Sequence, residues 1–403
     1  MEKSKILKDI EKSKKEQIEF LRKLVQTPSP NPYVKNPLKS SPYDPIELGV
    51  AELIYNTLEE FGFSPKFIGI SKLRPNVVCE FGKGKKTLIF NGHMDTIIPP
   101  RGYDFEPYSA TIKNGKLYGV GAADMKASLA CYVYMAKALS KYESELQGKI
   151  MLQFVIDEEP MAASHFGTWY LLENGYLGDA AIIGEPGMKK IRIGNRGGYR
   201  FKIEVFGDAI HTGSKKWEQR KKGRNAIIDM MKAIKALQDF KFPTENHKLF
   251  SGRKNVFTFP TVIKGGEAIN AVPDYCEALG DVRILPGVTK EFLENEIKRK
   301  LDRLGIAYKL SSIVYVPSVF IKSNEPIVKI LKENVLKVSG FKAKTAVAGP
   351  WSDMWMFISK GMPAVNLGCE GSGVHDKNEY VELKSVIEVT KIYSLTALKF
   401  FNE

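Results

Sequence analysis

The sequence predicts a doubly wound α/β core interrupted by a smaller α+β domain. In the first half of the chain, short apolar runs typical of buried strands alternate with stretches of helical periodicity, the order expected of a parallel sheet covered by helices. From Tyr199 to Gly207 the pattern changes to alternating apolar and polar residues, which indicates a strand with one face exposed to water. At 403 residues the chain is also longer than most single domains.

Strands and helices alternate through the first part of the chain. The first predicted element is a helix at 6–25, because apolar residues recur there at helical spacing. A long loop at 26–45 follows, since its prolines, serines and asparagines exclude regular structure. Helical periodicity returns at 47–62 and again at 127–139. Buried strands are predicted at 76–81, 86–93, 149–156 and 180–186.

An inserted domain interrupts this α/β pattern. The alternating strand at 199–207 opens it, and a helix at 225–237 and further strands follow. The strand at 307–316 is predicted to lead out of the insertion, after which the α/β pattern resumes. We therefore place the first part of the α/β core at 1–196, the inserted α+β domain at 197–313 and the second part of the core at 314–403.

Composition limits the classes of partner. Lysine and arginine outnumber aspartate and glutamate by 60 to 46, a net charge of +14 that would suit nucleic acids or anionic membranes. The excess is spread along the chain apart from KKWEQRKKGR at 215–224, so we predict a lysine-rich surface and no nucleic-acid partner. No apolar run approaches bilayer length and the N-terminus is unlike a signal peptide, which predicts no membrane partner and a cytoplasmic location. Four scattered cysteines predict reduced thiols.

Histidine and acidic residues follow the ends of the predicted core strands. His93 and Asp95 follow an apolar run, the triplet DEE at 157–159 follows another, and Glu185 ends a third. In open α/β sheets, ligands bind at the carboxyl ends of the strands. Because buried carboxylates are unfavourable without a partner, these strand ends predict a bound multivalent cation.

Two further residues join this predicted site. Asp124 follows the glycine-rich turn GVGAAD, and His375 lies in GSGVHD near the C-terminus. Histidines and carboxylates are ligands of catalytic zinc, and two histidines with three carboxylates can hold two ions if one carboxylate is shared. Asp95 lies two residues beyond His93, so its carboxylate is predicted to accept a hydrogen bond from the ring. Glu158 is left beside a ligand, where it can take a proton from water.

The motifs around these residues resemble those of the dinuclear zinc peptidases and deacylases, which include acetylornithine deacetylase, succinyl-diaminopimelate desuccinylase, aminoacylase and glutamate carboxypeptidase. GHMDTIIPP is similar to the family's G-H-x-D-x-V-P, LYGVGAADMKAS to its G-R-G-x-x-D-M-K-G, IDEE to its D-E-E, and IIGEP to its G-E-P. The histidine of GSGVH matches the family's last ligand. The resemblance covers nearly the whole chain and implies a zinc-peptidase core with an inserted dimerisation, or lid, domain.

The resemblance also implies two zinc ions per subunit, for which cobalt can substitute. Each ion would have three protein ligands, and one carboxylate would bridge them. The ligands would be His93, Asp124 and Glu185 for one ion and His375, Asp124 and Glu159 for the other.

The remaining site residues are assigned by the same resemblance. Asp95 would orient His93, and Glu158 would act as general base. The segment GDAIHTGSKKWEQRKKGRNAI is similar to the one through which family members dimerise and donate a histidine to the partner's active site. It implies a homodimer in which His211 hydrogen-bonds the oxyanion of the reaction. Three residues match positions that bind the substrate carboxylate in relatives: Arg196, Asn270 and Arg283.

Two segments depart from the family pattern. PMAAS at 160–164 replaces the glycines that usually follow D-E-E, and GPWSD at 349–353 stands where the desuccinylases have G-G-T-S-D. Trp351 therefore occupies the position of a small hydroxyl residue near the substrate. This difference disfavours succinyl-diaminopimelate as the substrate and raises the hypothesis of an apolar or aromatic acyl or side-chain pocket.

The sequence thus predicts a metal-dependent hydrolase of an amide bond next to a free α-carboxylate. An N-acyl-amino-acid deacylase of the acetylornithine deacetylase or succinyl-diaminopimelate desuccinylase type is the first interpretation. A carboxypeptidase or dipeptidase that cleaves short peptides is the second. The alternative from another class is a non-catalytic basic binding module built on the same scaffold.

Overall fold

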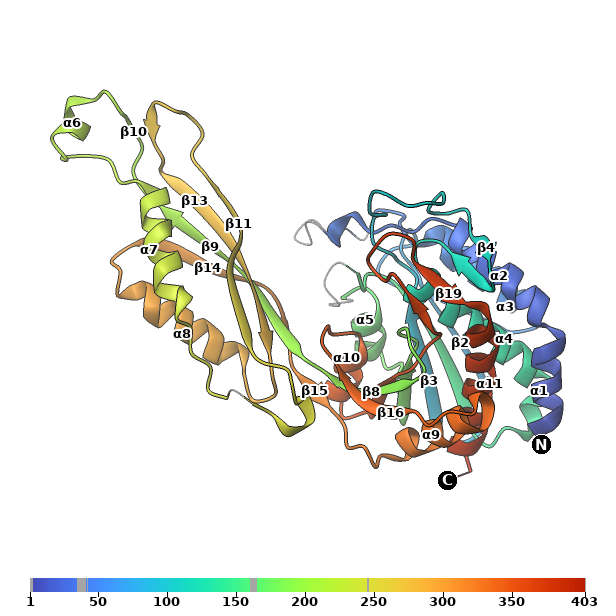
Figure 1. Cartoon of the computed structure of the whole chain (residues 1–403). Coiled ribbons are helices and arrows are strands. Elements are labelled where there is room, and N and C mark those ends of the chain that lie inside the picture. Colours follow the sequence, from blue (N-terminus) through green and yellow to red (C-terminus); the bar gives the residue numbers. More distant parts are fainter. Residues whose placement is uncertain (1–2, 35–40, 42, 160–164, 245, 403) are drawn as a thin grey trace. The chain divides into compact units, whose positions relative to one another are not determined.

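The structure, a computed structural model, describes residues 3–34, 41, 43–159, 165–244 and 246–402 (Figure 1). The chain forms two compact units: a core unit, drawn from 1–194, 320–348 and 352–403, and an inserted unit, made of 195–319 with 349–351. The inserted unit extends beyond the predicted range of 197–313 at both ends and takes in Trp351. Parts of two segments singled out in the sequence, 35–40 with 42 and 160–164, lie outside the described residues.

The centre of the core unit is a sheet whose middle strands run parallel. Strand β3 (Thr87–His93) lies between β6 (Lys149–Val155) and β7 (Ala180–Ile183) and pairs with both in parallel. His93 is opposite Val155 in this register, so the carboxyl ends of the strands meet at one edge. Each of these strands is almost entirely buried, which explains their continuous apolar sequences.

The full sheet has nine strands in the order β1-β2-β6-β3-β7-β17-β8-β15, with β16 also paired to β8. Strand β17, from the second part of the core, lies between β7 and β8 from the first part. The strands outside the parallel centre are β1 (Lys66–Ile68), β2 (Asn76–Gly82), β8 (Lys190–Asn195), β15 (Val319–Phe320), β16 (Lys344–Ala348) and β17 (Ala364–Asn366).

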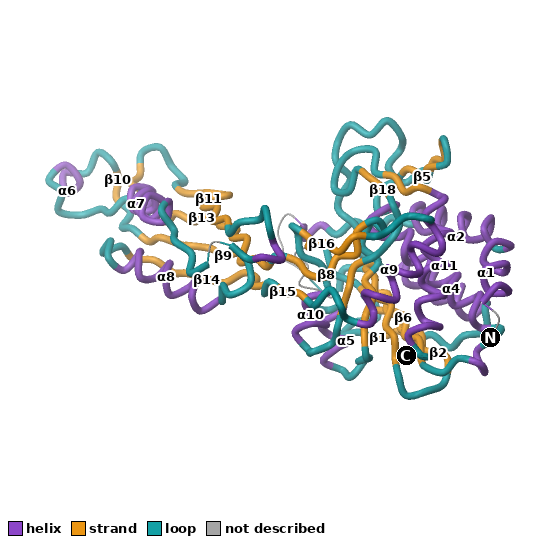
Figure 2. The backbone as a smooth tube through the Cα atoms, turned by 60° about the horizontal axis from the view of Figure 1, so that its bottom comes forward, coloured by secondary structure: helices purple, strands orange, loops and turns teal. Residues whose placement is uncertain are grey.

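Helices cover both faces of this sheet, as a doubly wound fold requires (Figure 2). On one face α4 (Ala127–Ser140) is buried on nearly all sides, because α1, α2 and α11 pack around it. The helices of that face are α1 (Lys3–Lys12), α2 (Lys14–Gln26), α3 (Leu48–Glu60), α4, α9 (Pro326–Ser339) and α11 (Leu383–Phe400). The opposite face carries α5 (Thr168–Glu173) and α10 (Met354–Ser359).

The N-terminal helix predicted at 6–25 is two helices, which are separated at Ser13. The Ser13 hydroxyl donates a hydrogen bond to the carbonyl oxygen of Ile10, the local side-chain contact by which serine competes with helix hydrogen bonding. In the portion of the chain that the structure describes, no helix combines the length and apolar character needed to cross a bilayer.

A second, smaller sheet of the core unit positions two candidate ligands. Its order is β18-β19-β5-β4, with bounds β4 (Thr111–Lys113), β5 (Lys116–Tyr118), β18 (Gly371–Ser372) and β19 (Tyr380–Glu382). Strand β5 leads into the irregular turn Ala122–Lys126, and His375 lies between β18 and β19. Because β5 and β19 pair, two segments far apart in sequence reach the same place.

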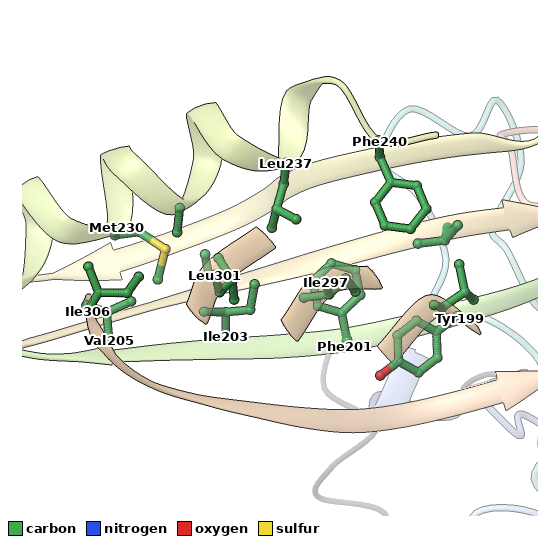
Figure 3. Packing of buried hydrophobic residues seen from close by; sticks show 14 of the residues in the cluster. Tyr199, Phe201, Ile203, Val205, Met230, Leu237, Phe240, Ile297, Leu301 and Ile306 are labelled. Atoms are coloured by element: carbon green, nitrogen blue, oxygen red, sulfur yellow. The ribbon is translucent and has the colours of Figure 1, made fainter. Parts of the chain in front are cut away.

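The inserted unit is a four-stranded antiparallel sheet of order β11-β13-β9-β14 with helices α7 and α8 on one face. Figure 3 shows alternate residues of β9, from Tyr199 to Val205, packed against these helices. The outward side chains of Arg200, Lys202 and Glu204 are polar, as the alternating sequence predicts, and the strand ends on the exposed Phe206. The strand bounds are β9 (Gly197–Phe206), β11 (Val256–Gly265), β13 (Tyr275–Ile284) and β14 (Ala307–Val316).

Side-chain caps start both long helices of the inserted unit. Asn225 accepts hydrogen bonds from the first backbone N–H groups of α7 (Ala226–Gln238), and Thr289 does so for α8 (Lys290–Asp302). The remaining elements lie near residue 211: the short pair β10 (Ile210–His211) and β12 (Ala271–Val272), and the single turn α6 (Lys215–Glu218).

Candidate metal centre

Two histidines face one carboxylate at the carboxyl edge of the core sheet. Nε2 of His93 lies 3.2 Å from Oδ1 of Asp124, and Nε2 of His375 lies 3.2 Å from Oδ2 of the same group. His93 ends β3, whereas Asp124 occupies the irregular turn after β5. Each oxygen of Asp124 therefore contacts a different imidazole, which is the arrangement required of a carboxylate shared between two ions.

Two glutamates extend this group. Glu159 lies four residues after Val155, the last residue of β6, and its Oε2 is 3.1 Å from Nε2 of His375. Donor atoms of His93, Asp124 and Glu159 all lie within 4.8 Å of one another, close enough to coordinate a common ion. Glu185 follows β7 at the same edge, and its carboxyl group is influenced by the charges of Asp124 and His93.

The electrostatics of the group fit a dication. Burial raises the pKa of Glu185 to about 8, and the nearby Asp124 adds to the shift. Burial also raises the pKa of Glu158 well above its usual range and raises the pKa of Glu159. The carboxylates thus outnumber the two imidazoles that could neutralise them. Nitrogen and oxygen donors crowded in this way are the ligand chemistry of a site for divalent metal ions.

The histidines already show the effect of their acidic partners. Hydrogen bonds with Asp124 and Glu159 raise the pKa of His375 to about 11. Burial opposes the charged form of His93, yet its contacts with Asp124 and the nearby Glu158 raise its pKa well above the ordinary value. Burial alone would raise the pKa of Asp124, but the two imidazoles hold it well below its usual range.

Asp95 lies beside His93, but its carboxylate does not make the predicted hydrogen bond to the ring. Nδ1 of His93 is 2.9 Å from the backbone carbonyl oxygen of Asp95 and 3.6 Å from Oδ1. The carboxylate instead accepts the backbone N–H groups of Glu158 and Glu159 at 3.2 and 3.1 Å, and the side-chain amide of Asn31 at 3.0 Å. Asp95 therefore orients His93 through its main chain and fixes the neighbouring glutamates through its side chain.

A buried ion pair that the sequence analysis missed lies behind these glutamates. Arg74 is fully buried; its Nε donates to Glu47 at 2.7 Å, and its Nη2 lies 3.3 Å from Asp157. Glu47 in turn accepts the backbone N–H of Asp157 at 3.2 Å. The available signal was an arginine directly before a buried strand, in LRPNVV, but nothing in the sequence indicates its distant partner Glu47.

In the inserted unit, the structure brings His211 and Asn270 together. The side-chain amide of Asn270 lies 3.4 Å from Nε2 of the exposed His211 ring, and β10 and β12 pair beside them. The backbone N–H of Gly213 donates to Nδ1 at 3.0 Å. A neutral ring that accepts at Nδ1 carries its proton on Nε2, and the Asn270 amide pairs with that N–H when its oxygen faces the ring. His211 can therefore act as a hydrogen-bond donor.

Arg196 and Arg283 lie in a separate cluster of the same unit. The guanidinium carbon of Arg283 lies over the Trp351 ring, 4.3 Å from the ring centroid. The Nε of Arg283 donates a hydrogen bond to Asp281 at 2.7 Å. Arg196 donates to the carbonyl oxygens of Gly349 and Lys254 at 3.2 and 3.1 Å. Burial and two nearby guanidinium groups lower the pKa of Arg196, so the cluster is rich in positive charge.

Two further arginines of this cluster escaped the sequence analysis. The guanidinium carbon of Arg200 lies 5.0 Å from the centroid of the Trp351 ring, and its Nε donates a hydrogen bond to Asp281 at 2.9 Å. Arg253 lies against Gly349, where a Cβ would meet its guanidinium group at 3.1 Å. Trp351, expected to shape an apolar or aromatic pocket, is thus flanked by cations within the inserted unit.

The His211 pair and the arginine cluster lie at opposite ends of strand β9. Arg196 immediately precedes β9, whereas His211 follows its far end. The ten residues of β9 span about 30 Å at the usual rise of a strand. Arg196, Asn270 and Arg283, predicted as one substrate-binding group, are therefore not gathered in one place within a single chain.

The whole chain has the fold of several solved peptidases. A di-peptidase from Saccharomyces cerevisiae matches with a TM-score of 0.77 at 16% identity, over 100% of this chain and 99% of that one. An M20 family metallo-carboxypeptidase from Sulfolobus solfataricus matches with a TM-score of 0.75 at 19% identity, over 95% and 99%. A dinuclear metal binding peptidase of the same family from Bacillus subtilis matches with a TM-score of 0.70 at 17% identity, over 97% of this chain and 99% of that one. These similarities confirm the predicted fold class.

Comparison with protein families gives the wider assignment. Residues 89–399 match Peptidase family M20/M25/M40. The matched range contains every candidate metal ligand of the core unit, and it confirms the resemblance to dinuclear metallopeptidases that the motifs predicted. The chain therefore belongs to peptidase family M20/M25/M40 and is a metal-dependent hydrolase of peptide or amide bonds.

Proposed function

We propose that the protein is a dinuclear zinc hydrolase that releases an amino acid from an N-acyl amino acid or a short peptide. The observation that carries the proposal is the position of Asp124, whose two oxygens each lie 3.2 Å from a different imidazole. His93 and Glu185 would complete one ion's ligands with Asp124, and His375 and Glu159 would complete the other's. Zinc is the expected metal because its catalytic sites take these ligand types, and cobalt is its expected substitute.

Glu158 is the proposed general base. It is buried beside the ligand Glu159, and its backbone is fixed by Asp95. When bound, the metal ions supply Lewis acidity that polarises the scissile carbonyl and acidifies water. Glu158 takes the proton from the attacking water and passes it to the leaving nitrogen as the C–N bond breaks. The products are the free carboxylic acid and the amine of the released amino acid.

The inserted unit would supply the other substrate contacts. Arg196 and Arg283 are proposed to bind the substrate α-carboxylate, for which a guanidinium fork is suited. His211 would donate a hydrogen bond to the oxyanion that forms on the attacked carbonyl, and Asn270 would support it. Since these two groups lie at opposite ends of β9, we propose that His211 and Asn270 act on the substrate bound by the partner subunit.

A second copy of the chain also suits the exposed apolar residues of the inserted unit. Ile228 and Met231 on α7 are 49% and 59% exposed. Val262 and Ile263 on β11, an outer strand of the unit's sheet, are 42% and 47% exposed. An outer strand with apolar side chains is a ready template for pairing with another chain, and a two-fold dimer would cover it.

Mixing two inactive variants tests the homodimer and the role of His211 together. His211→Ala should lose oxyanion stabilisation, and Glu158→Gln should lose the base. If His211 acts across the dimer, a mixed dimer contains one site with both groups intact, so mixing after mild dissociation should restore part of the wild-type turnover. The measurement is turnover of each variant and of the mixture. No recovery, in a mixture whose exchanged dimers are demonstrated by co-purification of two differently tagged subunits, would place His211 in its own subunit's site.

Amine release from a substrate panel tests the reaction itself. The panel contains N-acetyl, N-succinyl and N-aromatic-acyl amino acids and dipeptides, and it is assayed with metal-depleted protein before and after zinc or cobalt is added. We expect hydrolysis that depends on metal and on a free α-carboxylate. A preference for acyl amino acids would indicate a deacylase, and a preference for dipeptides a dipeptidase or carboxypeptidase. Silence across the panel with two metals bound would favour the alternative of a non-catalytic binding module.

A further inference from the structure

The carboxylate of Glu379 is buried next to the candidate bridging ligand. Its side chain is 1% exposed, and it accepts three backbone hydrogen bonds: from Gly121 at 3.0 Å, Ala123 at 2.8 Å and Asp124 at 2.9 Å. Within the described residues, no lysine, arginine or histidine forms an ion pair with it; Lys126, in the same turn, donates instead to the end of α2. Three converging N–H groups therefore satisfy both oxygens of this buried carboxyl group.

Those three N–H groups belong to the turn that presents Asp124. The turn is irregular: Gly121 has a positive φ of 77°, and Asp124 departs from helical geometry with φ −115° and ψ 90°. A backbone of this kind does not satisfy its own N–H groups by helical hydrogen bonding. Glu379 accepts them together and so selects one conformation of the turn.

The same residue connects the turn to the segment of His375. Glu379 lies four residues after His375, and its carbonyl oxygen accepts the N–H of Gly119 at 3.0 Å where β19 pairs with β5. Gly373, on the other side of His375, packs so closely that a Cβ there would lie 3.0 Å from the Cα of Glu379. One glutamate thus fixes both Asp124 and the loop that bears His375.

Other ligand-bearing segments of the core unit are held in a similar way. Asp95 accepts the N–H groups of Glu158 and Glu159. Glu370 accepts two N–H groups, at 2.7 and 2.9 Å, from the loop that follows Glu185. Of these carboxylates, Glu379 is the one bonded to the backbone N–H of Asp124, the ligand that faces both imidazoles.

We propose that Glu379 is a positioning residue of the dinuclear centre, which holds Asp124 at the point where its two oxygens can serve two ions. The proposal rests on the metal centre of the proposed function. It predicts that Glu379 affects the binding of both ions, because Asp124 contacts both imidazoles. It also predicts that Glu379 affects the geometry of the bound metals and not only the stability of the fold.

The test is metal affinity in Glu379→Gln, measured by competition with a chelating dye, together with the visible absorption spectrum of the cobalt-loaded protein. Glutamine keeps the size of the side chain but turns an N–H donor toward one of the backbone donors. We expect the affinity for both ions to fall about 10- to 100-fold, as for other residues that orient metal ligands, and the cobalt spectrum to change at saturating metal.

Glu143→Gln is the matched control. Glu143 accepts the backbone N–H of Gly82 at 3.1 Å, and Gly82 pairs with Lys149 at the edge of the sheet opposite His93. This control should bind metal like the wild-type chain. Wild-type affinity and an unchanged cobalt spectrum in a folded Glu379→Gln protein would overturn the proposal.

Two further experiments distinguish a variant that fails to fold from a metal centre that does not exist. If Glu379→Gln does not fold, Glu379→Asp decides: it keeps the charge but shortens the reach, so it should weaken metal binding, and wild-type binding would again overturn the proposal. The wild-type chain is titrated first. If it does not bind two ions, the metal centre itself is wrong, and the role of Glu379 falls with it.

Discussion

Replacing Glu158 by glutamine is expected to lower kcat by about 10²- to 10⁴-fold while two metal ions remain bound. The amide has nearly the shape of the carboxyl group, so the buried position beside Glu159 stays filled. It cannot accept a proton from water, and the loss therefore falls on turnover and not on metal content. Steady-state kinetics and metal analysis of the same sample measure the two effects separately.

Glu80→Gln is a suitable control for this variant. Glu80 is an exposed residue of β2 with a Lys149 partner 3.9 Å away, and its replacement should leave kcat unchanged because exposed ion pairs contribute little. Wild-type turnover in Glu158→Gln would remove Glu158 from the mechanism. Loss of metal from the same variant would instead make it a ligand.

Asp124→Asn is expected to abolish detectable hydrolysis and to weaken the binding of both ions. The carboxylate of Asp124 can offer one oxygen to each of the two proposed ions. The amide of asparagine has one oxygen and one NH₂ group, and the NH₂ group cannot coordinate a cation. One of the negative charges that offset the two cations is also lost. Without the metals the reaction loses several kcal/mol of transition-state stabilisation. Metal content after dialysis and amine release are the measurements.

A comparison with His375→Ala sharpens this second prediction. His375 is a proposed ligand of one ion, so its replacement should weaken one binding event and leave the other near the wild-type value. If Asp124→Asn still bound two ions as tightly as the wild-type chain, Asp124 could not be the bridge. Equal loss of both ions in His375→Ala would show that the two sites do not bind independently.

The edge of the core sheet could be predicted because its signal is local. An apolar run followed at once by an acid or a histidine needs no knowledge of distant residues, and the parallel pairing of β3, β6 and β7 brings three such ends together. The inserted unit was visible for a similar reason: alternation along 199–207 reports directly that one face of the strand is buried. Its boundaries were less accurate, because Trp351 joins it from a distant part of the sequence.

The residues that support the site could not be predicted, because their meaning depends on partners far along the chain. Glu379 acts on 121–124, and Arg74 acts on Asp157. Neither pair leaves a periodic or local pattern. The small sheet of the core unit was missed for another reason: strands of two or three residues are too short for alternation to be recognised.

The order of the ligands along the chain has a consequence for biosynthesis. His93 and the acidic ligands are translated before the inserted unit, whereas His375 emerges after it. Strand β17, which separates β7 from β8 in the finished sheet, also emerges late, so a nascent chain leaves the outer side of β7 unpaired, an edge open to aggregation. The proposed ligands of one ion, His93, Asp124 and Glu185, are thus complete before the inserted unit is made, whereas the site that needs His375 and the closure of the sheet both wait for the last part of the chain.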